Sequence, residues 1–556
     1  MDVLNAPAGA SDVRVARAGQ MFPTLADAEI ERIRRFGEVK RYSKGELVAR
    51  TGQAGLGLGV ILSGEIEIIQ GGSNLARSHV VTHHAGGFMG ELAQLSGRPS
   101  LVDAVARQDG ELLLIPPERL RALLVAEADL GERIMRALIL RRVGLLESGG
   151  TGPILIGHGG TAQLLALETF LGRNGHPHVC LDPAHDESAR ALLDRFAVTD
   201  DELPIVFCPN GDLLRSPTES ALARCLGLVT TIDPDRVYDV VIVGAGPAGL
   251  AASVYAASEG LDVLTLDCRA FGGQAGASAR IENFLGFPTG IAGMALMARA
   301  YNQAQKFGVE LAIPDEAARL ECPDGVRTDH KLTLANGESA RARAVVVATG
   351  ARYRQLDLPG IEAFEGSAIH FWASPIEARL CAGQHVALVG GGNSAGQAAV
   401  FLASKAGKVT LLARRLLAQT MSSYLVERIA AQPNIELVEG GEVTAVHGAE
   451  GRIETIDYRN RNTGAESTLP IEHLFLFIGA DPNTDWLAGT GIKLDDKGFV
   501  LTGKDAGEDR RVLETSRTGI FAIGDVRTGS VKRVAAAAGD GAQVVAAIHG
   551  YLASQS

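Results

Sequence analysis

Hydrophobic positions in the first quarter of the chain predict short strands closed by a helix. Residues 25–36 have the period of an amphipathic helix, and residues 117–146 return to that period. Between them, apolar runs separated by glycine turns occupy residues 46–49, 60–62 and 65–69. The pattern predicts a small β-roll with a C-terminal helix over residues 11–148, followed by a flexible Gly-Gly-Thr-Gly link.

The next segment, residues 153–229, alternates strands with helices. Its helical stretches lie at 162–171 and 188–196. Its apolar runs lie at 153–156, 179–181 and 205–207. The order β-α-β-α-β in so short a span predicts a small α/β module.

A strand, a glycine turn and a helix open the remainder of the chain. The strand at 239–243 leads into Gly244, Gly246 and Gly249, and a second strand ends at Asp267. The first glycine allows a tight turn, the second lets the backbone approach a pyrophosphate, and the third lets helix and strand pack closely. An acid after the second strand can accept a hydrogen bond from a ribose hydroxyl. The layout predicts a Rossmann-like dinucleotide site.

A second unit of the same kind begins near residue 385. Gly390, Gly392 and Ala395 occupy the three turn positions, and Arg414 and Arg415 replace the acid. Two guanidinium groups suit a 2′-phosphate, which an acid would repel, so this site is predicted to prefer NADPH over NADH. A solvated basic pair at a strand end is the alternative interpretation.

Composition sets broad limits on the function. The 556 residues predict three or four domains, and a net charge of −12 argues against a nucleic-acid or anionic-membrane partner. The sequence contains no recognisable signal peptide, membrane span or metal-binding cluster, which favours a cytoplasmic protein. The six cysteines are scattered and form no Cys-x-x-Cys, which is typical of a reducing compartment with mostly buried, inert thiols.

From about residue 238 to residue 552 the chain resembles bacterial low-molecular-weight thioredoxin reductases. The resemblance rests on Gly-Ala-Gly-Pro-Ala-Gly at 244–249, Gly-Gly-Gln at 272–274, Ile-Glu-Asn-Phe at 281–284, Ala-Thr-Gly-Ala at 348–351, Gly-Gly-Gly-Asn-Ser-Ala at 390–395 and Phe-Ala-Ile-Gly-Asp-Val at 521–526. It implies an FAD domain over residues 237–355 and 471–556, an inserted NADPH domain over 356–470, and a homodimer.

The resemblance also implies the cofactor contacts. FAD would be bound by Gly244, Gly246, Gly249, Asp267, Gly273, Gln274, Asn283, Gly350, Asp525, Arg533, Val534 and Ala535. NADPH would be bound by Gly390, Gly392, Asn393, Ser394, Ala395, Arg414 and Arg415. Asp525 would bond the ribityl chain, and residues 533–535 would lie near the flavin ring.

The chain departs from that family where the redox-active Cys-x-x-Cys should lie. Ala373 and Ile376 fall on the two cysteine positions, and neither can form a thiolate or a mixed disulfide. Cys381 follows a few residues later, and it is either a displaced thiol or, in the favoured interpretation, a buried cysteine. Hydride transfer to FAD should survive, because that chemistry belongs to the cofactors.

The first segment resembles cyclic-nucleotide-binding domains through Ile-Leu-Ser-Gly-Glu at 61–65 and Phe-Met-Gly-Glu-Leu-Ala at 88–93. The resemblance makes Gly90 and Glu91 the start of a phosphate-binding cassette, with Glu91 on the ribose hydroxyl. Ser100 stands where the cassette arginine should neutralise the cyclic phosphate. We therefore expect a different ligand, or a domain kept for assembly, rather than cAMP.

The second segment resembles the thioredoxin or glutaredoxin fold, with Pro204 as the family's cis proline. The active-site loop would be residues 157–162, which contain no cysteine. His158 in that loop is interpreted as an exposed residue, and Cys208 as structural. The module is predicted to be non-redox, and we suggest a docking surface for the reductase.

Three functions follow from these observations. The leading hypothesis is an NADPH-dependent flavoenzyme whose acceptor is open among quinones, oxygen, ferredoxin and a protein disulfide. The second is a flavin redox sensor regulated by a small ligand at the N-terminal domain. The third is a thioredoxin-disulfide reductase that uses Cys381 or a partner's thiols.

Overall fold

The fold is described from a computed structural model of the 556-residue chain. The described residues are 19–53, 56–70, 78–90, 100, 102–148, 152–209, 211–229, 232–322, 329–449 and 451–555. The chain divides into two compact units. One comprises Met1–His158, Phe170–Thr231 and Asn302–Pro314, and the other comprises Gly159–Thr169, Ile232–Tyr301 and Asp315–Ser556.

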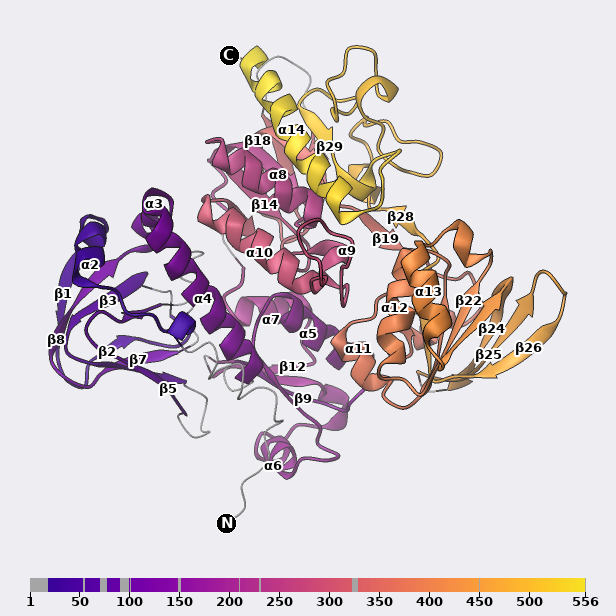
Figure 1. The fold of residues 1–556 in the computed structure, drawn as a ribbon, viewed down its shortest axis with the longest axis horizontal. Helices are drawn as coiled ribbons and strands as arrows, with labels where there is room; N and C mark the ends of the chain where they lie inside the picture. Colours follow the sequence, from indigo (N-terminus) through magenta and orange to yellow (C-terminus); the bar gives the residue numbers. More distant parts are fainter. Residues whose placement is uncertain are drawn as a thin grey trace. The chain divides into compact units, whose positions relative to one another are not determined.

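The first compact unit begins with the predicted β-roll (Figure 1). Two four-stranded antiparallel sheets, in the orders β1-β8-β3-β6 and β2-β7-β4-β5, carry cores of aliphatic side chains. The elements are α2 (Asp27–Ile33), β1 (Glu38–Tyr42), β2 (Leu47–Ala49), β3 (Leu58–Ser63), β4 (Ile66–Gln70), β5 (Ser78–His83), β6 (Phe88–Met89), β7 (Asp103–Ala106), β8 (Gly110–Ile115), α3 (Pro117–Ala126) and α4 (Ala128–Ser148).

The predicted C-terminal helix is two helices, α3 and α4, divided at Glu127. Glu127 leaves the helical region of backbone space with φ −113° and ψ 76°. Its carboxylate accepts hydrogen bonds from Arg32, in α2, and from Arg35, in the 3-10 turn that follows α2, at 2.6 and 2.9 Å. The helical period of residues 117–146 continues across this break, because both helices turn their leucines to the same core.

The second segment folds around a four-stranded sheet in the order β10-β9-β11-β12. Strand β9 pairs parallel with β10 and antiparallel with β11, and the Leu203–Pro204 peptide bond is cis, which confirms the prediction for Pro204. Strand β12 was not predicted. The elements are β9 (Ile154–Ile156), α5 (Ala162–Arg173), β10 (Val179–Leu181), α6 (Glu187–Arg195), β11 (Ile205–Phe207), β12 (Leu213–Arg215) and α7 (Glu219–Cys225).

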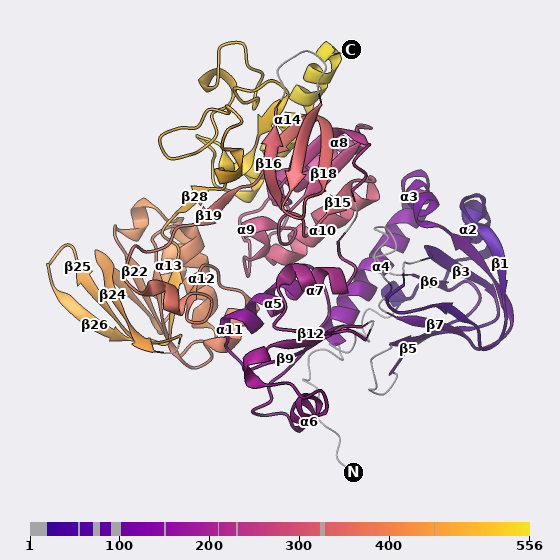
Figure 2. The same ribbon diagram turned by 180° about the vertical axis from the view of Figure 1, so that it is seen from behind.

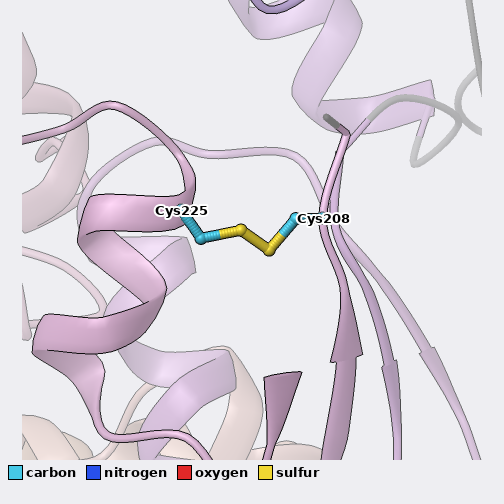
Figure 3. The surroundings of a disulfide bond; sticks show 2 residues. All are labelled: Cys208 and Cys225. Carbon is cyan, nitrogen blue, oxygen red and sulfur yellow. A yellow bond between two sulfur atoms is a disulfide. The ribbon is translucent and has the colours of Figure 1, made fainter. Parts of the chain in front are cut away.

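Two of the cysteines are joined in a disulfide, which the expectation of a reducing compartment with mostly buried, inert thiols did not include. Cys208, after strand β11, forms a disulfide with Cys225 at the end of helix α7 (Figure 3). The two Cα atoms are 6.4 Å apart, within the usual range for a disulfide. Cys180 and Cys268 are exposed and Cys381 is buried, so the prediction of mostly buried thiols holds for Cys381 and is wrong for the first two.

The second compact unit contains a sheet in the order β14-β13-β18-β17-β16, with β29 paired to β18. Strand β13 is parallel to β14 and to β18, and helices α8 and α14 pack against each other beside it (Figure 1). The elements are β13 (Val237–Val243), α8 (Pro247–Ser258), β14 (Val263–Leu266), α9 (Gly273–Gly276), α10 (Gly293–Lys306), β16 (Ala317–Glu321), β17 (His330–Leu334), β18 (Ser339–Val347), β29 (Ile520–Ala522) and α14 (Val534–Gln555). The end of α10, from Asn302, and strand β15 (Glu310–Ala312) belong to the first compact unit.

A second parallel sheet, in the order β20-β27-β21-β22-β23, repeats this plan, and a three-stranded sheet β24-β25-β26 adjoins it (Figure 2). The elements are β19 (Ala351–Tyr353), β20 (Ile369–His370), α11 (Pro375–Leu380), β21 (His385–Val389), α12 (Asn393–Ala403), β22 (Lys408–Ala413), α13 (Ser423–Ala431), β23 (Ile435–Glu439), β24 (Gly441–Ala449), β25 (Arg452–Asn460), β26 (Glu466–Pro470), β27 (His473–Leu476) and β28 (Ala480–Pro482).

The chain enters and leaves this second sheet through a two-stranded ribbon, β19 paired with β28. Strand β27 belongs to the second sheet, where it pairs with β20 and β21. The inserted sheet therefore extends past residue 470, where the sequence placed its end. The reason is that the chain returns toward the first sheet only at the ribbon, after β27 has been completed.

Candidate functional site

The first glycine turn has the backbone geometry that its three glycines require. Gly244 has a positive φ of 112°, and a Cβ there would lie 2.2 Å from the Ala348 carbonyl oxygen. A Cβ on Gly249 would lie 1.8 Å from the Gly244 carbonyl oxygen. Gly246, at the N-terminus of α8, meets nothing closer than 3.8 Å. Gly244 and Gly249 therefore permit close packing, and Gly246 leaves the helix N-terminus open to an anion.

Asp267 ends the second strand of this unit and lies against the glycine turn. Its carboxylate accepts hydrogen bonds from the backbone N–H groups of Ala245, Arg269 and Ala270, at 2.9, 3.1 and 3.2 Å. These donors fix the carboxylate at the carboxyl end of β14.

Other residues predicted for FAD surround the same turn. Gly273 follows Gly272, both have positive φ, and a Cβ on Gly273 would lie 3.1 Å from the Gly246 Cα. Gln274 donates its side-chain amide to the Ala351 carbonyl oxygen, next to Gly350. Asn283, in contrast, lies in a loop closed by bridges between Ile281 and Ile291.

Asp525 lies in a 3-10 turn, Gly524–Val526, between strand β29 and helix α14. Burial raises the pKa of its carboxyl group. Sequence reasoning missed the residue that holds this turn: Asp540 accepts from the Gly524 N–H at 3.0 Å and pairs with Arg527 at 3.1 Å. Arg533 and Ala535 are exposed, and Val534 is half-buried at the start of α14.

The second glycine turn repeats this geometry. Gly390 has a φ of 153°, and a Cβ there would lie 2.6 Å from the Phe477 carbonyl oxygen. Gly392 has no atom within 4 Å of its Cβ position, while Ala395 is fully buried. The Asn393 side chain accepts from the Ser422 N–H at 2.8 Å, which ties α12 to the start of α13.

Arg414 and Arg415 follow strand β22, at the position that Asp267 occupies in the first glycine-turn unit. Both are exposed, and neither forms an ion pair within the described part of the chain. The pKa of Glu442 is lowered mainly by its hydrogen bond with Arg461, and Arg414 adds to that field. The end of β22 thus presents two guanidinium groups to solvent.

The loop that replaces the cysteine pair is closed by hydrogen bonds to one buried carboxylate. Glu377 is 5% exposed and accepts from the Trp372 indole N–H at 3.0 Å and from the Ser374 N–H at 2.8 Å. The Ser374 hydroxyl also contacts Glu377 and accepts from the Ile376 N–H at 3.1 Å. This is a capping box at the start of α11, and its signature, Ser-Pro-Ile-Glu, was readable in the sequence.

Cys381 lies at the other end of α11 in an apolar core. It has no exposed surface and packs in the same cluster as Ala373 and Ala378. Burial raises the pKa of its thiol to about 12. Because the thiolate is the reactive form, Cys381 is poorly suited to disulfide exchange.

A cavity of about 240 Å³ brings residues of three predicted motifs together. Gln274, Ala373 and Ser394 line it. Four aromatic side chains, those of Tyr353, Trp372, Phe401 and Phe477, also line it, together with the charged side chains of Arg280, Glu282 and Arg428.

In the N-terminal β-roll, Gly90 follows strand β6, and Glu91 lies outside the described residues. Ser100 is 4% exposed, and its hydroxyl donates to the Val102 carbonyl oxygen at 2.9 Å. The residue at the expected arginine position is therefore bonded within the fold.

Comparison with known proteins agrees with these observations. The family described as Pyridine nucleotide-disulphide oxidoreductase matches residues 238–541, and the Cyclic nucleotide-binding domain matches residues 39–127. A thioredoxin reductase of Streptomyces coelicolor is 35% identical over 321 residues, covering 58% of this chain and 95% of its own. A thioredoxin reductase of Bacillus subtilis is 32% identical over 320 residues, covering 57% and 96%.

Among solved structures, thioredoxin reductase of Lactococcus lactis matches 57% of this chain and 99% of its own, with 28% identity and a TM-score of 0.52. The chain belongs to the pyridine nucleotide-disulphide oxidoreductase family. Within that family it is a thioredoxin reductase-like, NADPH-dependent flavoprotein oxidoreductase with FAD as its second cofactor, fused to a cyclic-nucleotide-binding β-roll. In the described part of the chain, no helix has the length and apolar character needed to cross a bilayer.

Proposed function

We propose that the second compact unit oxidises NADPH at the glycine turn of α12 and reduces FAD at the glycine turn of α8. When bound, the nicotinamide supplies a hydride and the isoalloxazine accepts it. The two turns favour this assignment because Gly246 and Gly392 each leave a helix N-terminus open to phosphate oxygens.

The chain's own residues would orient the two cofactors by charge. Asp267, fixed by three backbone N–H donors, would accept from a ribose hydroxyl of FAD, and Asp525 would accept from its ribityl chain. Arg414 and Arg415 would bind the 2′-phosphate that distinguishes NADPH from NADH. Gln274 and Ser394 line one cavity, which is consistent with the reacting ends of the two cofactors meeting there.

We further propose that electrons leave the flavin without passing through a dithiol of this chain. The observation that supports this most strongly is the closed loop at Trp372, Ser374 and Glu377, where the family carries its cysteines. Cys381 is buried with a raised pKa and does not substitute for them. The acceptor would be a quinone, oxygen, ferredoxin or a disulfide on another protein.

A steady-state comparison of acceptors tests this proposal. NADPH oxidation by the FAD-loaded protein is measured with a soluble quinone, oxygen, ferredoxin and oxidised thioredoxin, in the wild type and in Cys381→Ser. At least one acceptor other than thioredoxin should turn over at rates that Cys381→Ser leaves unchanged. Rapid thioredoxin reduction that disappears in Cys381→Ser would contradict the proposal and support a displaced thiol.

A second candidate function is a ligand-regulated redox sensor, which the match of residues 39–127 to the Cyclic nucleotide-binding domain favours. Slow turnover together with a flavin spectrum that changes on adding a cyclic nucleotide would support it. Fast turnover that cyclic nucleotides leave unchanged would support the plain enzyme. Homodimer formation and a cytoplasmic location stay predictions of the sequence.

A further inference from the structure

The β-roll contains a buried arginine at the point where the cassette begins. Arg141, on helix α4, is 7% exposed. Its Nε donates to the Met21 carbonyl oxygen at 2.9 Å, and its Nη1 donates to the Gly90 carbonyl oxygen at 2.9 Å. Two backbone acceptors therefore fix the plane of the guanidinium group beside Gly90.

Two aromatic rings hold the same group in place. The Arg141 Cζ lies 4.5 Å from the centre of the Phe88 ring and 5.1 Å from that of Phe22. Cation–π contacts of this kind stabilise a guanidinium group without neutralising its charge. The group is therefore rigid and remains a net cation.

The third nitrogen of Arg141, Nη2, is buried, and no residue that the structure describes accepts a hydrogen bond from it. Within the described residues no carboxylate forms an ion pair with Arg141, and burial alone lowers its pKa, to about 9. A titratable neighbour is His83, whose pKa is lowered to about 3, by burial first and then by Arg141. His83 is therefore neutral at physiological pH and supplies no counter-charge.

A buried cation without an anion is costly, because desolvation is not repaid by a Coulombic partner. An anion placed at Nη2 would supply both the missing acceptor and the missing charge. The cassette position that would normally bring an arginine to a phosphate holds Ser100, whose hydroxyl is used by Val102.

We propose that Arg141, from helix α4, is the anion-binding residue of the N-terminal domain, and that the domain's ligand carries a phosphate group. The positive charge absent at residue 100 would then come from the helix that closes the β-roll. A cyclic phosphodiester and a phosphomonoester share this chemistry, and the test separates them.

Titration calorimetry on the full chain, loaded with FAD and saturated with NADP⁺ to block the reductase sites, tests the proposal. The probes are cAMP, AMP and adenosine, which carry a cyclic phosphodiester, a phosphomonoester and no phosphate. At least one phosphate-bearing probe should bind the wild type while adenosine does not. Binding to cAMP alone would identify the diester, and binding to AMP alone the monoester.

Arg141→Gln should weaken that binding by about 10-fold or more, the usual contribution of a charge-assisted hydrogen bond. Arg136→Gln is the matched control, because Arg136 lies on the same helix and pairs at the surface with Glu132. Should Arg141→Gln not fold, Arg141→Met fills the space between the two rings and carries the same prediction. Equal phosphate binding by the neutral variant, or no phosphate binding by the wild type at millimolar concentration, would overturn the proposal.

Discussion

The two glycine-turn units of the reductase have nearly the same backbone and opposite charge at one position. In each, a parallel strand leads into a glycine with positive φ, and the following helix begins at a glycine with open space around it. At the end of the next strand the first unit has Asp267, held by backbone N–H groups, and the second has Arg414 and Arg415, exposed to solvent.

This difference separates two tasks within one fold. The glycines determine how closely a nucleotide can approach the backbone, and the residue after the second strand determines which nucleotide is accepted. The units also differ at their third turn position, where the first requires Gly249 and the second accommodates Ala395.

The largest effect is expected from the third turn position. A methyl group in Gly249→Ala would lie 1.8 Å from the Gly244 carbonyl oxygen, so the turn must open, and we expect loss of bound flavin. The reciprocal change, Ala395→Gly, should cost only about 1 kcal/mol of stability, through helix propensity, and retain NADPH binding. Absorbance of purified protein near the flavin band and a titration with NADPH check the two variants. Full flavin content in Gly249→Ala would mean that the two turns are equivalent.

A smaller effect is expected from the basic pair. Arg414→Gln combined with Arg415→Gln should raise the KM for NADPH by about 10- to 100-fold, since each charge-assisted hydrogen bond contributes about 1.5–3 kcal/mol. The KM for NADH should barely change, because NADH lacks the 2′-phosphate. Arg452→Gln, an exposed arginine on the adjoining sheet, controls for net charge. An unchanged ratio of the two KM values would leave the pair as a solvated basic patch.

The two glycine-turn units should also respond differently to acid. In the second, His370 and His473 share a hydrogen bond of 3.0 Å, and burial lowers their pKa values to about 3 and about 4. These histidines protonate in the unfolded chain near pH 6.5 but stay neutral in the fold. Their contribution to stability is therefore complete above pH 6.5 and falls as the pH drops toward 4, by up to about 1.4 kcal/mol per pH unit for each proton.

In the first glycine-turn unit an opposing group reduces this effect. Burial lowers the pKa of His330 to about 4 but raises that of Asp315 to about 6. Asp315 is protonated more readily in the fold than in the unfolded chain, so protonation of Asp315 stabilises the fold as the pH falls. Over the same range the effect of His330 destabilises the fold, and the two effects partly cancel. The free energy of unfolding, measured in urea between pH 6.5 and 4.5, should depend much less on pH in the double variant His370→Gln and His473→Gln than in the wild type. The reduction should be smaller in His330→Gln, which removes one histidine. Equal slopes in all three proteins would contradict this account.

The smallest effect is expected at Cys381. Cys381→Ser should leave NADPH-driven quinone reduction within about 2-fold of the wild type and lower the free energy of unfolding by roughly 1 kcal/mol, because a hydroxyl replaces a buried apolar thiol. Turnover and chemical denaturation measure the two quantities. A large loss of turnover with the fold intact would place this thiol in the electron path.

Local signals in the sequence predicted the parts of the fold that local contacts determine. The glycine turns at 244 and 390 follow from short-range steric rules, whereas the cis bond before Pro204 was implied by the resemblance to the thioredoxin fold. The break at Glu127 was missed because it depends on arginines more than ninety residues away. The capping box at Ser374 is a local feature with a signature in the sequence, Ser-Pro-Ile-Glu.

The disulfide and the buried arginine could not be predicted in the same way. Cys208 and Cys225 are 17 residues apart, and only the positions of β11 and α7 bring them together. Arg141 is 51 residues from Gly90, and a helical arginine is usually solvated, so its burial follows from the docking of α4 on the β-roll.

An anaerobic titration of the FAD-loaded protein with NADPH tests the central claim most directly. A flavin that passes no electrons to a dithiol accepts two electrons when it is fully reduced. One NADPH delivers two electrons. We predict that the flavin absorbance is fully bleached at one equivalent of NADPH per FAD. A requirement for two equivalents would mean that a disulfide of this chain takes electrons from the flavin, and the account would be contradicted.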